Sequence, residues 1–142
     1  MYTAALNRQI TYGVVDKHNS IGVPNPTGPI VIGAFIVEDS SPTNAYIHVV
    51  SQRSAWGKGL MDEGGELVVA DMFAQHPKLL RLSAYMQAGN NAAIEFTKRR
   101  GFTREGFMRD MFTIKGKPKN IVHYGLTRKD YEAGHQPAPQ EE

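Results

Sequence analysis

The residues with the clearest chemical potential form a glycine-rich loop, Ser54-Ala55-Trp56-Gly57-Lys58-Gly59. An apolar strand precedes this loop, and a predicted helix begins directly after it. Two glycines around one lysine let the backbone turn tightly, so several N–H groups point at one spot beside the positive end of the helix dipole. This arrangement is typical of a phosphate or diphosphate site. On the loop alone, an ordinary glycine-rich turn is an equally good interpretation.

Two well-known phosphate motifs do not fit this loop. Lys58 is followed by Gly59 rather than by Ser or Thr, so the loop is not of the Walker type. Asp62 occupies the position of the third glycine of a dinucleotide fingerprint. The chemistry of the loop therefore has to be inferred from the elements around it.

A strand–helix–strand unit positions the loop. Residues 10–15, 30–37 and 46–50 are predicted strands, and a long Gly-, Pro- and Asn-rich loop separates the first two. From residue 60 the pattern becomes helical, because Leu60, Gly64, Leu67, Val68 and Met72 fall on one face. Pro77 marks the end of this helix, and residues 79–86 alternate as a strand. The unit is therefore a right-handed βαβ crossover.

The remaining residues predict a short helix, a hairpin and a tail. The helix opens at the capping residues Asn90 and Asn91 and ends at Gly101. Strands at residues 111–114 and 121–126 flank a turn. Residues 1–131 then form one domain, and residues 132–142 a flexible tail.

The amino-acid composition excludes several kinds of protein and of site. The chain has 142 residues, no cysteine and a net charge of 16 − 14 = +2. Disulfide scaffolds, thiolate metal sites and cysteine nucleophiles are therefore excluded. The five histidines show no metal-ligand spacing, so no metal is expected. With neither a signal peptide nor a long apolar run, we expect a soluble, cytoplasmic protein without a membrane partner.

Three segments in order carry a family resemblance. They are Trp56-Gly57-Lys58-Gly59-Leu60, then Asn90-Asn91-Ala92-Ala93 with Gly101-Phe102, then residues 105–110 with Gly116 and residues 124–126. Over residues 32–131 the sequence resembles the GNAT acyltransferase superfamily, in the branch similar to ribosomal-protein N-terminal acetyltransferases. The resemblance implies an α/β (α+β) fold: a mixed, twisted sheet of about six strands around a central βαβ acetyl-CoA unit, with a shortened N-terminus.

The resemblance also implies where acetyl-CoA binds. The loop amides would hold the diphosphate, with Lys58 adding charge, and the pantetheine arm would lie where the preceding strand parts from its parallel neighbour. The Val49 N–H would stabilise the oxyanion. The residues so assigned to acetyl-CoA are Val49, Val50, Ser51, Trp56, Gly57, Lys58, Gly59, Leu60, Met61, Asn90 and Phe96.

The implied reaction is direct transfer of an acetyl group from acetyl-CoA to a primary amine, on a small molecule or a protein N-terminus. His48 is the candidate base, although a structural histidine is an alternative. Thr97 stands where many family members have a tyrosine acid, and Tyr124, Tyr46 or Tyr85 could replace it. A GNAT-fold protein that binds without catalysing is the alternative function.

The sequence also bears on which partners the chain could have. Relatives usually place two helices before the second strand to form one wall of the acceptor site. Here that wall is missing or supplied by a partner, and a homodimer is left open. The basic run Lys98-Arg99-Arg100 is interpreted as a solvated helix face, so nucleic acid is not the expected partner.

Overall fold

The computed structural model describes residues 9–19, 21–24, 28, 30–57 and 59–134. Lys58, which is predicted to add positive charge at the diphosphate, lies outside the described residues. So do residues 135–142, which make up most of the predicted tail. The elements in chain order are β1 (Gln9–Asp16), β2 (Ile30–Ser41), β3 (Asn44–Ser51), the short 3-10 helix η1 (Arg53–Ala55), α1 (Leu60–Gln75), β4 (Arg81–Gln87), α2 (Asn91–Arg99), β5 (Thr103–Ile114), β6 (Lys117–Thr127) and α3 (Arg128–Glu132).

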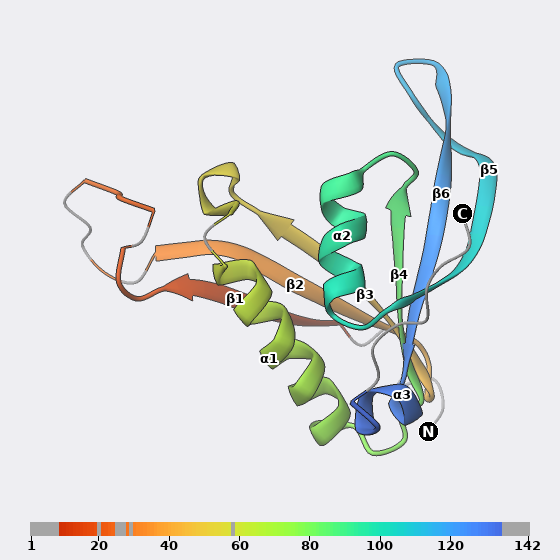
Figure 1. Cartoon of the computed structure of the whole chain (residues 1–142), viewed down its shortest axis with the longest axis horizontal. Helices are drawn as coiled ribbons and strands as arrows, with labels where there is room; N and C mark the ends of the chain where they lie inside the picture. The colour runs from red at the N-terminus through yellow and green to blue at the C-terminus, as the bar shows by residue number, and fades with distance from the viewer. Residues whose placement is uncertain (1–8, 20, 25–27, 29, 58, 135–142) are drawn as a thin grey trace.

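One six-stranded sheet organises the chain, in the order β1-β2-β3-β4-β6-β5 (Figure 1). β3 and β4 are parallel and are joined through α1, whereas the other neighbouring strands are antiparallel. The predicted mixed sheet with a central βαβ unit is therefore confirmed.

Two predicted segments need correction at the C-terminal end. β5 begins at Thr103 rather than at residue 111, because bulges between Arg104 and Gly106 and between Met108 and Phe112 break the alternation by which a strand is recognised. The predicted tail also begins too early. Glu132 closes α3, whose first turn is capped by the Thr127 hydroxyl accepting from the Asp130 N–H.

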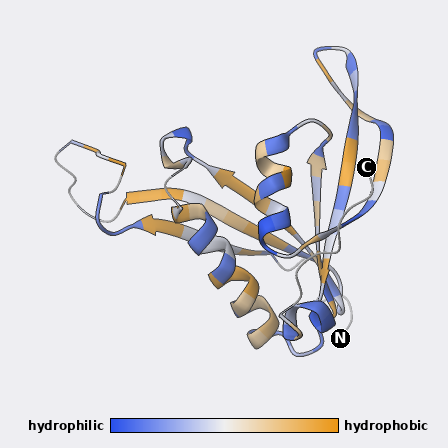
Figure 2. Ribbon diagram, viewed as in Figure 1, coloured by the Kyte–Doolittle hydropathy of each residue, from blue (hydrophilic) through white to orange (hydrophobic). Residues whose placement is uncertain are grey.

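α1 and α2 pack against one face of the sheet. The buried face of α1 consists of Met61, Gly65, Val68, Val69, Met72 and Phe73, whereas Leu67, part of the predicted apolar stripe, is exposed. Figure 2 shows hydrophobic residues concentrated on β1, β2 and β3 and hydrophilic ones on α3. The core therefore lies between the central strands and the inner side of α1.

Two adjacent glycines let α1 approach both of its neighbours. A Cβ atom at Gly64 would lie 2.9 Å from Cγ2 of Val14 on β1, and one at Gly65 would lie 3.0 Å from Cζ of Phe96 on α2. A side chain at either position would push α1 away. The helix propensity lost at these glycines, about 1 kcal/mol each, is therefore offset by close packing.

Candidate functional site

A gap opens in the sheet where β3 and β4 part. The two strands pair only at Asn44–Arg81, Ala45–Leu82 and Tyr46–Ser83, and beyond these positions they diverge (Figure 1). A cleft of about 950 Å³ lies in this gap and under the start of α1 and of α2. The expected parting of the parallel strands is confirmed.

Main-chain groups line both sides of the gap. The Gln52 N–H donates to the Ile32 carbonyl at 2.8 Å, so by the alternation of an antiparallel ladder Val49 and Ser51 turn their N–H groups away from β2 and into the gap. On the other side, the Ala88 N–H donates to the Asn120 carbonyl at 2.9 Å. The same alternation turns the main chain of Tyr85 and Gln87 toward the gap. An extended ligand that carries amide groups can therefore pair there as an added strand would.

The start of α1 is open at the end of this gap. Gly57 and Gly59 adopt φ angles of 75° and 77°, in the left-handed region that glycine enters without strain. Gly59 is the N-cap and supplies no side-chain acceptor. Within the described part of the chain, no residue accepts a hydrogen bond from the N–H groups of Gly57 or of residues 59–62. This cluster of donors at the positive end of a helix suits an anion.

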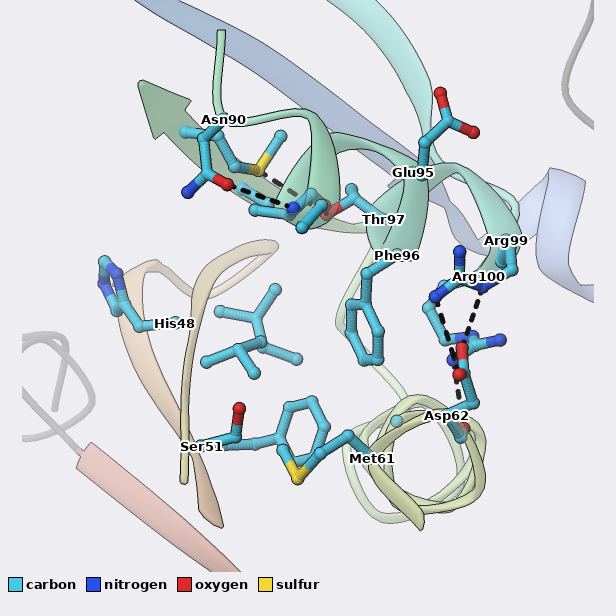
Figure 3. A pocket seen from close by; sticks show the side chains of 18 of the residues that line it. His48, Ser51, Met61, Asp62, Asn90, Glu95, Phe96, Thr97, Arg99 and Arg100 are labelled. Atoms are coloured by element: carbon cyan, nitrogen blue, oxygen red, sulfur yellow. Dashed lines mark hydrogen bonds and ion pairs between the residues drawn. The ribbon is translucent and has the colours of Figure 1, made fainter. Parts of the chain in front are cut away.

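An ion-pair cluster fixes the first turn of α1 to the end of α2 (Figure 3). Arg100 donates to the Asp62 carboxylate at 2.8 Å and lies 2.9 Å from a Glu66 oxygen, and its side chain is only 8% exposed. Arg99 also donates to Asp62, at 2.9 Å, but its side chain is 51% exposed. The interpretation of the basic run as a solvated face is therefore wrong for Arg100.

The electrostatics of Asp62 follow from this cluster. Partial burial alone raises the pKa of the Asp62 carboxyl, but hydrogen bonds and positive charge from Arg99 and Arg100 outweigh burial and hold the pKa below its ordinary 3.8. Sequence reasoning missed this carboxylate because its partners lie nearly forty positions away. A signal was present in the form of an acidic residue in the first helical turn and a basic run at the end of the next helix.

Most of the predicted site residues come together around the cleft. Those that line it are His48, Val49, Val50, Ser51, Trp56, Gly57, Gly59, Met61, Asn90 and Phe96. Leu60 begins α1 but packs against the core beside the cleft. Tyr124 is 3% exposed and belongs to the core, so its hydroxyl is not presented to the cleft.

Trp56 and Ser51 form the outer rim of the cleft. The Trp56 indole N–H donates to the Ser51 hydroxyl at 3.0 Å, and the Arg53 guanidinium lies over the indole ring at 5.5 Å. Trp56 is exposed, so it is a rim residue rather than a core residue.

The α2 side of the cleft is formed by Asn90 and Phe96. The side-chain oxygen Oδ1 of Asn90 accepts from the Ala93 N–H at 3.3 Å, as expected of a capping residue. Phe96 stacks on Phe35 at 6.1 Å and points from α2 toward α1 (Figure 3).

Thr97 cannot stand in for a tyrosine acid in this arrangement. Its hydroxyl donates to the Ala93 carbonyl at 2.8 Å, within the same helix, and the residue is buried. The hydroxyl proton is therefore already used inside α2.

Tyrosine and histidine side chains lie on the opposite face of the sheet, at the same gap. Ala45 and Ile47 are buried under the helices, so the alternate residues Tyr46 and His48 project from the other face. His48 Nε2 lies 3.4 Å from a Glu38 carboxylate oxygen. Figure 3 shows His48 pointing away from the helices.

Tyr85 joins this group from β4. Its hydroxyl lies 3.3 Å from that of Tyr46, and its ring stacks between those of Tyr46 and His123 at 5.2 and 4.4 Å. The hydrogen bond with Tyr46, reinforced by burial, raises the pKa of Tyr85 above its ordinary 10.0. Tyr85 lines the cleft, so of the alternatives to Thr97 it is the tyrosine that reaches the site.

Among the residues that the structure describes, no group of three or more His, Asp or Glu side chains could hold a metal ion. No helix in the described ranges is both long and apolar enough to cross a membrane.

One family model matches most of the chain. The family model described as "Acetyltransferase (GNAT) domain" matches residues 3–103. No curated protein matches the chain significantly. The chain spans 57% and 60% of the length of the first two solved structures that it resembles.

Three solved structures illustrate the similarity in fold. A variant of spermidine N-acetyltransferase SpeG from Vibrio cholerae is 15% identical with a TM-score of 0.73, covering 87% of this chain and 68% of its own. A GNAT-family acetyltransferase from Bacillus anthracis is 19% identical with a TM-score of 0.65, covering 70% and 60%. The ribosomal L7/L12 α-N-protein acetyltransferase RimL, in complex with coenzyme A, is 21% identical with a TM-score of 0.63, covering 68% and 55%.

Proposed function

The chain belongs to the GNAT acetyltransferase family, and from that premise we propose that it transfers an acetyl group from acetyl-CoA directly to a primary amine. The family uses acetyl-CoA, and the RimL structure contains coenzyme A. The observation that carries the proposal is the open start of α1 at the end of the gap between β3 and β4. A diphosphate and an extended amide chain need these two features side by side.

Each part of acetyl-CoA has a matching part of the site. The N–H groups of residues 57 and 59–61 bind the diphosphate, and the rim residue Trp56 shields it. The pantetheine arm lies in the gap against Val49, Val50 and Ser51, with Asn90 and Phe96 on the α2 side. The Val49 N–H, which points into the gap, donates to the thioester carbonyl and stabilises the oxyanion.

Side chains on the face of the sheet opposite to α1 and α2 carry out the proton transfers. The amine nitrogen attacks the thioester carbon, the carbon–sulfur bond breaks, and the acetyl group ends on nitrogen. His48, oriented by Glu38, takes the proton that leaves the nitrogen. Tyr85 supplies the proton that the CoA sulfur gains, in place of the occupied Thr97 hydroxyl. This scheme needs no covalent enzyme intermediate.

The acceptor is a small-molecule amine or a protein N-terminus. The structural relatives include proteins named for both kinds of substrate, spermidine and a ribosomal protein. Within the described residues no helix stands between β1 and β2.

Two measurements on the purified chain test the proposal. Calorimetry with acetyl-CoA should show saturable binding, and a thiol-release assay with spermidine and with a peptide bearing a free N-terminus should show turnover. Absence of acetyl-CoA binding would refute the proposal. Binding without turnover on any amine would support the alternative of a non-catalytic GNAT-fold protein, which the occupied hydroxyl of Thr97 favours.

A further inference from the structure

An ion pair crosses β6 on the face of the sheet opposite to α1 and α2. Arg81 of β4 donates from both terminal nitrogens of its guanidinium to the two carboxylate oxygens of Glu105 on β5. β6 lies between these two strands (Figure 1). The β6 residue beneath the pair is Gly125, where a Cβ atom would overlap both the guanidinium and the carboxylate. A side chain at residue 125 would therefore displace the ion pair.

A β-bulge brings Glu105 to this position. β5 pairs with β6 at Arg104–Tyr124 and next at Gly106–His123. Glu105 is therefore an extra residue of β5 between two successive residues of β6, and such a bulge re-aims a side chain. Nε2 of His123 lies 3.9 Å from a Glu105 carboxylate oxygen. The bulge thus places one carboxylate beside both His123 and the Arg81 guanidinium.

His123 extends this group to Tyr85. Its ring stacks on that of Tyr85 at 4.4 Å, and the ring of Tyr46 stacks on Tyr85 at 5.2 Å. Among the described residues, the buried Nε2 of His123 has no hydrogen-bond partner. Burial lowers the pKa of His123 below its ordinary 6.5, an effect that the Glu105 charge opposes and the Arg81 charge reinforces. His123 is therefore a neutral ring at pH 7, packed against Tyr85.

Arg81 also links the ion pair to the place where β3 and β4 last pair. Its Nε donates to the Ser83 hydroxyl at 3.1 Å, and this hydroxyl donates to the side-chain oxygen of Asn44 at 2.9 Å. Arg81 and Ser83 are both in the three-residue ladder between the two strands, and Ser83 pairs there with Tyr46. By holding Arg81, Glu105 fixes the side chains at the point where the gap begins.

Arg81 and Glu105 act in opposite directions on the Tyr85 hydroxyl. The hydrogen bond with Tyr46 is the largest cause of the raised pKa of Tyr85, followed by burial. Of the two charges, that of Arg81 lowers this pKa and that of Glu105 raises it. The titratable side chains around Tyr85 on this face are Glu38, Tyr46, His48, Arg81, Glu105 and His123.

We propose that Glu105 is a positioning residue for Tyr85: through Arg81 and His123 it holds the Tyr85 ring at the start of the gap. This inference rests on the proposed acetyl transfer, in which Tyr85 gives its proton to the CoA sulfur. Glu105, Arg81 and His123 are not among the residues that line the cleft. Loss of Glu105 should therefore change kcat rather than the binding of acetyl-CoA.

Glu105→Gln tests this role, because it removes the charge and keeps the size of the side chain. In a thiol-release assay, kcat should fall about tenfold, whereas KM for acetyl-CoA should stay within about twofold. NMR of the chain labelled with carbon-13 at tyrosine Cζ follows the ionisation of Tyr85, which Tyr85→Phe identifies. The pKa of Tyr85 should be lower in Glu105→Gln, because the Arg81 charge is no longer balanced.

Two further variants separate position from charge. Gly125→Ala removes no charge but displaces the ion pair, so it should lower kcat by a similar factor. Glu132→Gln breaks a matched Glu–Arg pair on α3, and it should leave both kcat and the Tyr85 titration unchanged. The melting temperature of each variant checks that it folds.

The outcomes distinguish this role from the reaction itself. If the unmodified chain turns over, full kcat in Glu105→Gln or an unchanged Tyr85 titration would overturn the positioning role and leave acetyl transfer in place. If the unmodified chain acetylates no amine, acetyl transfer is refuted, and with it any role of Glu105 in that reaction.

Discussion

The Arg100 guanidinium holds Asp62 at two points, donating to its carboxylate at 2.8 Å and to its main-chain carbonyl at 3.0 Å. This contact joins the end of α2 to the first turn of α1, where the loop amides gather. Arg100 also lies over the Phe96 ring at 5.0 Å. One buried side chain therefore sets the spacing of the two helices that bound the cleft.

Removing Arg100 should be far more damaging than removing its neighbour. Arg100→Met leaves the Asp62 and Glu66 carboxylates without their buried partner, and we expect the free energy of unfolding to fall by about 1–3 kcal/mol. Arg99 is mostly exposed, so Arg99→Met should cost less than about 1 kcal/mol. Urea denaturation of the two variants gives the comparison. Equal losses would show that Arg100 does not connect the helices.

The Asp62 cluster also predicts a pH dependence of stability. The pKa of Asp62 is lower in the folded chain than its ordinary 3.8. The ionised carboxylate therefore contributes stability that is fully present above the unfolded pKa and is lost as pH falls through the folded pKa. The difference in unfolding free energy between the unmodified chain and Asp62→Asn should be constant from about pH 5 to 8 and shrink below about pH 4. A difference that grows on acidification would contradict the ion-pair assignment.

Replacing Gly33 even by alanine should destabilise the fold. A Cβ atom there would lie 2.6 Å from the Val50 carbonyl oxygen and 2.7 Å from Sδ of Met61. Because the first of these is backbone, Gly33→Ala should lower the unfolding free energy by about 1–3 kcal/mol and weaken acetyl-CoA binding at the same wall of the cleft.

Gly13 on the neighbouring strand is the matched control for Gly33. A Cβ atom there meets nothing within 4 Å, and its φ angle is not positive. Gly13→Ala should be neutral or slightly stabilising, by up to about 1 kcal/mol. Thermal unfolding of both variants checks this pair, and equal melting temperatures would show that the close approach at Gly33 has been misassigned.

The kcat values of variants at Thr97, His48 and Tyr85 test the proposed proton transfers. Thr97→Val removes a hydroxyl that is already bonded to Ala93, so kcat should stay within about twofold. His48→Gln and Tyr85→Phe each remove a proton-transfer group, so each should lower kcat roughly 100-fold. Steady-state assays with acetyl-CoA and the best amine measure all three. A large loss in Thr97→Val with none in Tyr85→Phe would reverse the assignment of the acid.

Local patterns were enough to predict the central part of the fold. Glycines at residues 57 and 59, the asparagine cap at residue 90 and the period of each segment act over a few positions, so they can be read from neighbouring residues. The family resemblance then supplied the parting of the strands. The bulged start of β5 was missed because a bulge removes the alternation that identifies a strand.

The side-chain network of the site required the three-dimensional structure. Asp62 and Arg100 are far apart in the sequence, and so are Tyr46 and Tyr85, which meet only because β3 and β4 are adjacent. Tyr124 was a candidate acid by residue type alone. Its side chain is buried in the core, which only the three-dimensional structure shows.

The most direct test of the account is an NMR titration of the nitrogen-15-labelled chain with coenzyme A. We predict that the amide resonances of Gly57 and of residues 59–62 shift most, and that the amide of Gly13 on β1 stays in place. Saturable binding that leaves the amides at the start of α1 unmoved, or no binding at all, would contradict the claim that this helix start holds the diphosphate.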